Sequence, residues 1–242
     1  MSRMKKLFLA TLVAGASFIL GSANASAQIR ILPFGDSVTS FGSSPESSYR
    51  YWLFVDLTNA GFQFQQDFVF VGDKSGTEDG PPANNWPAEE YSGGGGQTAA
   101  EAAGEAPGIA SQTQPDIVLM DFGSNDYDGS QSPKDTLAGV RTSLDAAIQA
   151  FAQNNPNTII LLARPTPWVT TDKGTKQFMS GLGGAVAKAA KDERKAGVNV
   201  IVVNIAGGFS RRRDTKDDGV HPNVPGEQKI ANKYFRVLRK LI

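Results

Sequence analysis

The sequence lacks cysteine and has a single histidine, and both facts narrow the chemistry it can perform. Among 242 residues there is no Cys, and the only His is His221. Disulfide frameworks, thiolate nucleophiles and Cys-ligated metal centres are therefore excluded. One chain also cannot assemble a zinc site from several histidines. Imidazole chemistry within one chain must use His221.

The sequence also has no excess of charge of one sign. Lys+Arg and Asp+Glu both number 24, so the formal net charge is zero, and 40% of the residues are hydrophobic. Nucleic-acid binders concentrate basic residues on one face. The basic run Arg211-Arg212-Arg213 is short and of the kind that is normally solvated. We expect a folded protein with no nucleic-acid partner.

The only long apolar run lies at the N-terminus. Three basic residues precede an apolar run over residues 7–21, and small residues follow it. This three-part pattern is typical of a secretory signal peptide, and the run is shorter than the roughly 20 residues that span a bilayer. We expect residues 1–27 to be a signal peptide that is cleaved after Ala27 or, as a second choice, after Ala25.

Residues 28–242 would then form the mature protein. Cleavage removes three basic and no acidic residues, which leaves 21 basic against 24 acidic side chains and a net charge of −3. A chain of this length fits one α/β domain. No later segment is apolar enough to span a membrane. We expect a secreted monomer, in the periplasm or the medium, with no membrane partner after cleavage.

Short β-rich runs alternate with helical patterns along the mature chain. The runs predicted as strands are residues 29–34, 68–71, 117–120, 159–162 and 200–203. Helical patterns cover residues 48–60, 133–154, 176–196 and a stretch from about residue 225 to the C-terminus. The last three strands are almost wholly apolar, as in a sheet covered on both faces. This order predicts a three-layer α/β/α sandwich with a five-stranded parallel sheet.

One long irregular stretch, residues 73–96, interrupts this alternation. It contains three Pro and six Gly, and loops of this length in compact domains are usually functional or mobile. Trp86 and Tyr91 lie within it. Either they stack on a sugar ring or they pin the loop to the core, and the sequence favours neither alternative.

Three polar clusters follow predicted strands or precede the last helix. They read Gly35-Asp36-Ser37, Gly123-Ser124-Asn125-Asp126 and Asp218-Gly219-Val220-His221-Pro222. In open α/β sheets, sites lie beyond the carboxyl ends of the strands. We therefore expect a hydroxyl, an amide, a carboxylate and the only imidazole to meet at one edge of the sheet.

This set of groups is sufficient for acyl transfer. A serine hydroxyl becomes a nucleophile when a base takes its proton, and histidine is the suitable base near neutral pH. A carboxylate holds the imidazole tautomer, and Asp218 stands three residues before His221, a spacing that one short turn can bring together. Amide donors would stabilise the oxyanion of the tetrahedral intermediate.

These clusters, together with a glycine before Gln97-Thr98, match in order the four motif blocks of one family. The chain resembles the SGNH (GDSL-type) hydrolases over nearly all of its mature length. Within that group, Leu32-Pro33-Phe34-Gly35-Asp36-Ser37-Val38-Thr39 and Phe68-Val69-Phe70-Val71-Gly72 are similar to the carbohydrate esterases that include acetylxylan esterases of family three. The His-Glu-Gly sequence that precedes the second block in those esterases is absent.

The resemblance implies a role for each block and a flavodoxin-like architecture. Ser37 would be the nucleophile, with Asp218 and His221 completing the triad. The oxyanion hole would use the backbone N–H of Ser37, the side-chain amide of Asn125 and the N–H of a glycine. Matching on Gln97-Thr98 selects Gly96, and matching on Tyr91-Ser92 selects Gly93 as the alternative.

The expected function is that of a secreted serine ester hydrolase. It would remove acetyl or short acyl groups, from a polysaccharide or a small ester, without a metal or organic cofactor. Two alternatives remain open at this stage. The same triad could serve a lipase or thioesterase, or the fold could be a non-catalytic carbohydrate-binding protein.

Overall fold

The computed structural model describes residues 28–42, 48–78, 86–87 and 90–242. The expected signal peptide lies outside these residues, so its cleavage remains a prediction. The elements are, in chain order, β1 (Ile29–Gly35), α1 (Ser37–Ser40), α2 (Ser48–Asn59), β2 (Phe68–Phe70), β3 (Ser92–Gly93), α3 (Ala99–Thr113), β4 (Ile117–Asp121), α4 (Pro133–Asn154), β5 (Ile159–Ala163), α5 (Lys173–Lys195), β6 (Val200–Val203) and α6 (Val224–Leu238).

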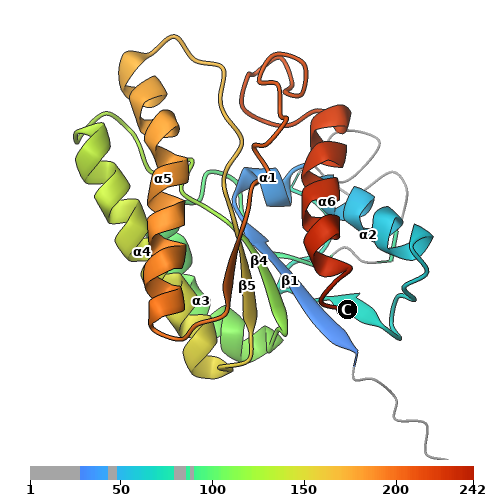
Figure 1. Ribbon diagram of the computed structural model, residues 1–242. Coiled ribbons are helices and arrows are strands. Elements are labelled where there is room, and N and C mark those ends of the chain that lie inside the picture. The colour runs from blue at the N-terminus through green and yellow to red at the C-terminus, as the bar shows by residue number, and fades with distance from the viewer. Residues whose placement is uncertain (1–27, 43–47, 79–85, 88–89) are drawn as a thin grey trace, which may run out of the picture.

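Five strands form the main sheet, and they are the five predicted from sequence. They lie in the order β2-β1-β4-β5-β6, and all neighbours pair in parallel. Counting these five strands alone, this is the flavodoxin-like order. Helices α3, α4 and α5 cover one face, and α2 and α6 cover the other (Figure 1). The predicted three-layer α/β/α sandwich is confirmed.

The apolar runs occur because both faces of the sheet are buried. Successive side chains of a strand point to opposite faces. In β4, Val118 and Met120 join the core beneath α3, α4 and α5, whereas Ile117 and Leu119 join the core beneath α2 and α6. A strand that feeds two cores needs an apolar residue at every position.

Capping side chains set the ends of the helices. Ser132 Oγ accepts from the N–H of Asp135 at 3.2 Å, just before Pro133 begins α4. Asp172 Oδ1 accepts from the N–H of Thr175 at 2.7 Å. Because Asp172 caps the chain there, α5 begins at Lys173 and not at the predicted residue 176.

Three elements were not predicted from the sequence: α1, α3 and β3. Helix α1 has only four residues, and α3 holds a capping box between Thr98 and Glu101 but also contains Pro107. Strand β3, two residues long, pairs with the end of β1 and makes a sixth strand beside the predicted five. A strand this short inside a glycine-rich stretch has no alternation to detect.

The carboxyl ends of the strands point to one edge of the molecule. In Figure 1 this edge is at the top, where α1 lies close to the loop that precedes α6. The strand order reverses its direction between β1 and β4, which is the topological switch point of the sheet. Within the described ranges, none of the helices combines the length and apolarity needed to cross a membrane.

Candidate active site

Backbone pairing brings the first three motif blocks together. Gly35, the last residue of β1, lies opposite Gly93 of β3 and Asp121 of β4. The N–H of Asp36 donates to the Asp121 carbonyl at 3.1 Å, and the N–H of Gly94 donates to the Gly35 carbonyl at 3.1 Å. The residues preceding Ser37 are thus held from both sides.

Glycine is required at the closest of these approaches. Gly93 has a φ of +98°, and a Cβ atom there would lie 2.2 Å from the Gly35 carbonyl oxygen. A Cβ atom on Gly35 would lie 2.2 Å from Thr39 Oγ1. Both positions therefore need a residue without a side chain.

Ser37 begins α1 and is 7% exposed. Asp36 precedes it as the N-cap, and Asp36 Oδ1 accepts from the N–H of Val38 at 3.0 Å. Asp36 thus has the turn-forming role that its position before a short helix suggests. The serine hydroxyl lies at the carboxyl edge of β1, where the sequence analysis expected it.

Asn125 joins the three blocks through its side chain. Its Nδ2 donates to the Gln97 carbonyl at 3.1 Å and to Asp36 Oδ2 at 3.3 Å. The next residue, Asp126, accepts from the N–H of Ala99 at 3.0 Å. The side-chain amide of Asn125 is therefore held by Asp36, the residue that directly precedes Ser37.

Asp218 and His221 form a direct pair. His221 Nδ1 lies 2.7 Å from Asp218 Oδ2, and Asp218 Oδ1 accepts from the N–H groups of Val220 at 2.8 Å and His221 at 2.9 Å. Partial burial acts to raise the pKa of Asp218, but these hydrogen bonds outweigh it and hold that pKa below its usual value. A carboxylate only accepts, so Nδ1 carries the proton and Nε2 is left as the acceptor.

Two contacts link the Asp218–His221 turn to the residues that follow α1. Phe41 donates its N–H to the Ser37 carbonyl at 2.9 Å, and its ring centroid lies 5.2 Å from that of His221. Lys216 Nζ donates to the Gly42 carbonyl at 2.9 Å. Across the described part of the chain, no hydrogen bond joins Ser37 Oγ directly to His221. Catalytic hydrogen bonds are often longer before substrate binds.

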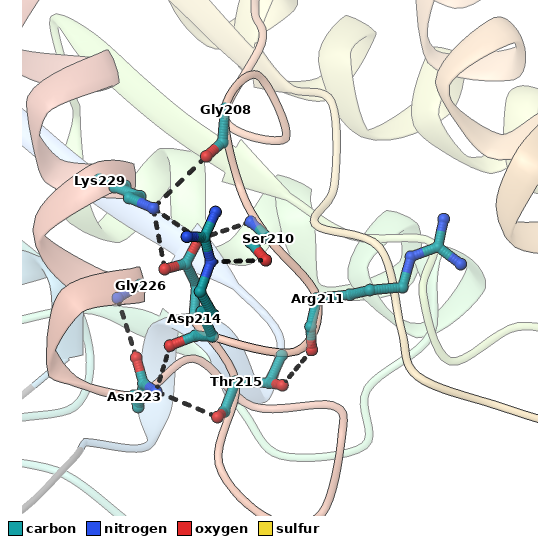
Figure 2. A network of polar contacts seen from close by, with 9 residues as sticks. Gly208, Ser210, Arg211, Asp214, Thr215, Asn223, Gly226 and Lys229 are labelled. Carbon is teal, nitrogen blue, oxygen red and sulfur yellow. Dashed lines mark hydrogen bonds and ion pairs between the residues drawn. The ribbon is translucent and has the colours of Figure 1, made fainter.

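A polar network fixes the loop that carries the turn (Figure 2). Asp214, which is buried, accepts from Lys229 Nζ at 2.7 and 2.8 Å and from the N–H of Ser210. Asn223 Nδ2 donates to the Thr215 carbonyl at 3.1 Å. Burial acts to raise the pKa of Asp214, but the Lys229 and Ser210 hydrogen bonds outweigh it and lower that pKa.

The two glycines that are candidates for the oxyanion hole, Gly93 and Gly96, lie in different environments. Gly93 is buried beside Gly35, whereas Gly96 is exposed, with a φ of +74° and open space where a Cβ would lie. Between them, the N–H of Gly94 is used by Gly35 and that of Gly95 by Glu78. Neither candidate is tested by these contacts, and both remain predictions.

A buried carboxyl pair behind Ser37 was not found from the sequence. Asp36 and Asp121 are 1% and 2% exposed. Burial, together with the charge of Asp121, raises the pKa of Asp36 well above its usual value, and burial raises the pKa of Asp121 to about 7. No sequence signal distinguishes these residues from ordinary turn acids.

The described parts of the stretch 73–96 are held against the core. Trp86 and Tyr91 are buried, and the guanidinium of Arg50 lies 4.2 Å from the Tyr91 ring centroid. Arg50 is itself fully buried and donates to the Thr39 carbonyl at 2.9 Å and the Gly76 carbonyl at 2.6 Å. Of the two alternatives for these aromatic residues, pinning the loop is therefore the correct one.

The described part of the chain contains no group of three or more His, Cys, Asp or Glu side chains arranged to hold a metal ion.

Comparisons with known proteins identify the family. The sequence profile of the GDSL-like lipase/acylhydrolase family matches residues 34–229, a range that contains all four motif blocks. The chain belongs to this family and is a carboxylic ester hydrolase of the SGNH type. A search of the curated proteins finds no match.

Solved structures add a likeness to one group of esterases. An acetyl esterase mutant crystallised with an acetate ion matches with a TM-score of 0.73 and 23% identity, and a carbohydrate esterase family 3 protein from Talaromyces cellulolyticus with 0.72 and 23%. A Clostridium thermocellum family 3 carbohydrate esterase matches with 0.69 and 27%. Each alignment covers 88% of this chain and 98% of the other. The chain is thus an SGNH hydrolase that resembles family 3 carbohydrate esterases.

Proposed function

We propose that this protein is a secreted serine esterase that removes acetyl or short acyl groups from a polysaccharide through an acyl-enzyme on Ser37. The observation that carries the proposal is the hydrogen-bonded Asp218–His221 pair, which is brought to the end of α1 by Phe41 and Lys216. The pair supplies an oriented base, and α1 begins with the only serine of the first motif block.

Acylation follows from the tautomer of His221. As Ser37 Oγ attacks the ester carbonyl, its proton passes to Nε2, because Nδ1–H is held by Asp218. The tetrahedral intermediate then collapses, the ester C–O bond breaks, and the imidazolium returns the proton to the departing alcohol. Asp218 stabilises the imidazolium while it exists.

Deacylation repeats these steps with water. His221 takes a proton from water as the water oxygen attacks the acyl-enzyme, and Ser37 leaves with that proton. The products are a carboxylic acid and the free enzyme, so no oxidant, metal or organic cofactor enters the balance. During both steps the oxyanion would accept from the N–H of Ser37, the amide of Asn125 and the N–H of Gly96 or Gly93.

The polysaccharide substrate rests on the structural likenesses. The Clostridium thermocellum relative is a family 3 carbohydrate esterase, and another relative is an acetyl esterase. Acetyl groups on sugars are therefore the first substrates to test.

Secretion rests on the N-terminal pattern alone. N-terminal sequencing of the protein from culture fractions tests it. Cleavage after Ala27 or Ala25 would support secretion, and an intact N-terminus would contradict it.

Ser37→Ala tests the central step. We expect p-nitrophenyl acetate hydrolysis to fall by roughly 10⁶ in kcat, and we expect a fluorophosphonate probe to label the parent protein but not the variant. Ser40→Ala is the matched control, because Ser40 lies in the same helix and its buried hydroxyl has no partner among the described residues. Full activity of Ser37→Ala would refute the acyl-enzyme, and glycan binding without turnover by the parent protein would favour a binding module.

A substrate panel tests the acyl and alcohol groups. Acetylated oligosaccharides are compared with aryl esters of increasing chain length. A preference for acetyl sugars supports the proposal. Faster turnover of long acyl chains would replace the polysaccharide substrate with a lipid or thioester while leaving the chemistry intact.

A further inference from the structure

A cleft beside the candidate active site is lined by cations. Its volume is about 380 Å³, and it lies between α5, the segment that follows β5 and the loop that follows β6. The lining includes Arg164, Lys176 and Arg211 together with Trp168, and it contains no Asp or Glu. A concave surface with several cations and an indole favours an anionic ligand with an apolar face.

These cations have no acidic partner among the residues that the structure describes. None of the ion pairs in the described part of the chain includes Arg164, Lys176 or Arg211. Lys176 Nζ has a carbonyl contact, to Thr171 at 3.4 Å. The positive charge in the cleft is therefore available to a ligand, since none of the described acidic residues neutralises it.

Two other basic side chains near Arg211 bond to side chains of the same loop. Lys229 is paired with the buried Asp214, and Arg213 Nε donates to Ser210 Oγ at 3.4 Å. Arg211 extends away from this network, on the side opposite Lys229 (Figure 2). All three arginines of the run are exposed, as expected, and Arg211 is the one that lines the cleft.

The wall of the cleft is bonded to the Asp218–His221 turn. The N–H of Val169, next to Trp168, donates to the Gly219 carbonyl at 2.7 Å, and a Cβ atom on Gly219 would lie 2.8 Å from Val169 Cβ. Gly219 lies between Asp218 and His221 in the chain. The backbone therefore joins the wall of the cleft directly to the turn that carries the base.

We propose that this cleft binds a carboxylate-bearing sugar residue, a uronate, that neighbours the acylated sugar in the polysaccharide. The inference rests on the proposed function and names its substrate class. Guanidinium groups pair with carboxylates through parallel hydrogen bonds, which makes Arg164 and Arg211 suited to a uronate. Trp168 offers an aromatic face to the C–H groups of the ring.

The position of Arg164 depends on a glycine of α5. A Cβ atom on Gly183 would lie 2.2 Å from Arg164 Nε, whereas Gly184 has open space at that position. Ala is favoured over Gly inside a helix. Gly183→Ala should therefore move the Arg164 guanidinium without removing its charge or weakening the helix, and Gly184→Ala is its matched control.

The test compares two acetylated oligosaccharides that differ in one group. One carries a uronate beside the acetylated sugar, and in the other that uronate is reduced to the neutral sugar. For the parent protein we expect a KM for the acidic substrate lower by about fivefold, and we expect high salt to reduce this preference. Equal KM values for both substrates would overturn the inference.

Variants then assign the preference to the cleft. Arg164→Gln with Arg211→Gln should remove the preference and leave hydrolysis of p-nitrophenyl acetate unchanged, and Gly183→Ala should weaken the preference. Arg212→Gln, which alters the adjacent exposed arginine, and Gly184→Ala should retain it. A preference that survives the double variant contradicts the assignment.

A binding measurement separates this inference from the proposed function. Calorimetry of Ser37→Ala with the acidic and the neutral oligosaccharide reports on the cleft without any hydrolysis. If the parent protein does not hydrolyse aryl esters, the proposed esterase function is refuted. Equal binding of both oligosaccharides to Ser37→Ala would refute the cleft alone.

Discussion

The two halves of the candidate active site are built in different ways. Ser37, Asp36 and Asn125 lie at strand ends, and the first two are almost completely buried. In the other half, the side chains of His221 and Asp218 are 23% and 43% exposed and lie on a loop. The nucleophile side is held by backbone pairing with two strands. The base side is held by hydrogen bonds between loops, from the Lys216 side chain and from backbone groups such as the N–H of Val169.

This difference predicts that variants on one side of the site mainly change stability and variants on the other side mainly change activity. Changes on the strand side alter buried polar groups and should change stability, since burial of an unpaired polar or charged group is costly. Changes on the loop side should cost activity and little stability, because exposed groups remain hydrated. Four variants test this division, from the largest expected effect to the smallest.

His221→Ala should have the largest effect on activity. Without the base, kcat for p-nitrophenyl acetate should fall by roughly 10⁵ to 10⁶. The melting temperature should change little, because the imidazole is partly exposed. Thermal unfolding and steady-state kinetics of the same preparation check both expectations, and a strongly lowered melting temperature would break the proposed division.

Asp218→Asn should lower kcat by about 10⁴. The amide oxygen can still accept from the N–H groups of Val220 and His221, so the turn should keep its shape. What is lost is the charge that stabilises the imidazolium. Asp217→Asn, which alters the adjacent exposed acid, is the control and should be fully active. Equal activity of both variants would exclude Asp218 from the triad.

Asn125→Ala should affect both properties. The loss of one oxyanion donor predicts a fall in kcat of about 10² to 10³. The variant also removes a donor from the Gln97 carbonyl and from Asp36, which predicts a loss of roughly 1 to 3 kcal/mol in unfolding free energy. Chemical denaturation measures that loss, with Asn157→Ala at an exposed position as the control. A fall in stability with full activity would remove Asn125 from the oxyanion hole.

Asp121→Asn should change the dependence of stability on pH. Burial raises the pKa of Asp121 from an ordinary 3.8 to about 7, so between these values the folded state holds a proton that the unfolded chain has released. Stability should therefore decline as the pH rises from about 4 to about 7. The variant should flatten this decline and be more stable than the parent protein by about 1 to 3 kcal/mol near pH 8.

Denaturation curves at a series of pH values check this prediction. A parent protein whose stability rises steadily from pH 4 to pH 7 would show that Asp121 is ionised in the fold. Activity is a useful second measurement, because the Asp121 carbonyl accepts from the N–H of Asp36, the residue before Ser37.

The sequence was sufficient for those parts of the fold that depend on local pattern. Five strands, the start of α4 and the convergence of the motif blocks at one edge could be predicted, because apolar runs and caps are local signals. Strand β3 could not, since it forms only because Gly93 can approach Gly35.

Buried charge was the other part that the sequence did not disclose. Arg50 sits in a helix where a basic residue is normally expected to face solvent, yet it is fully buried and links α1 to the loop. The Asp36 and Asp121 pair also depends on two strand ends that are far apart in the chain. Such partners become visible only when the tertiary contacts are known.

The raised pKa of Asp121 has a consequence for an enzyme whose turnover liberates a carboxylic acid. As product accumulates in a weakly buffered surrounding, the solution acidifies towards the range in which Asp121 takes up its proton. Over that interval this residue makes the folded state more resistant to unfolding. The contribution of Asp121 to the stability of the fold would thus increase as the reaction proceeds.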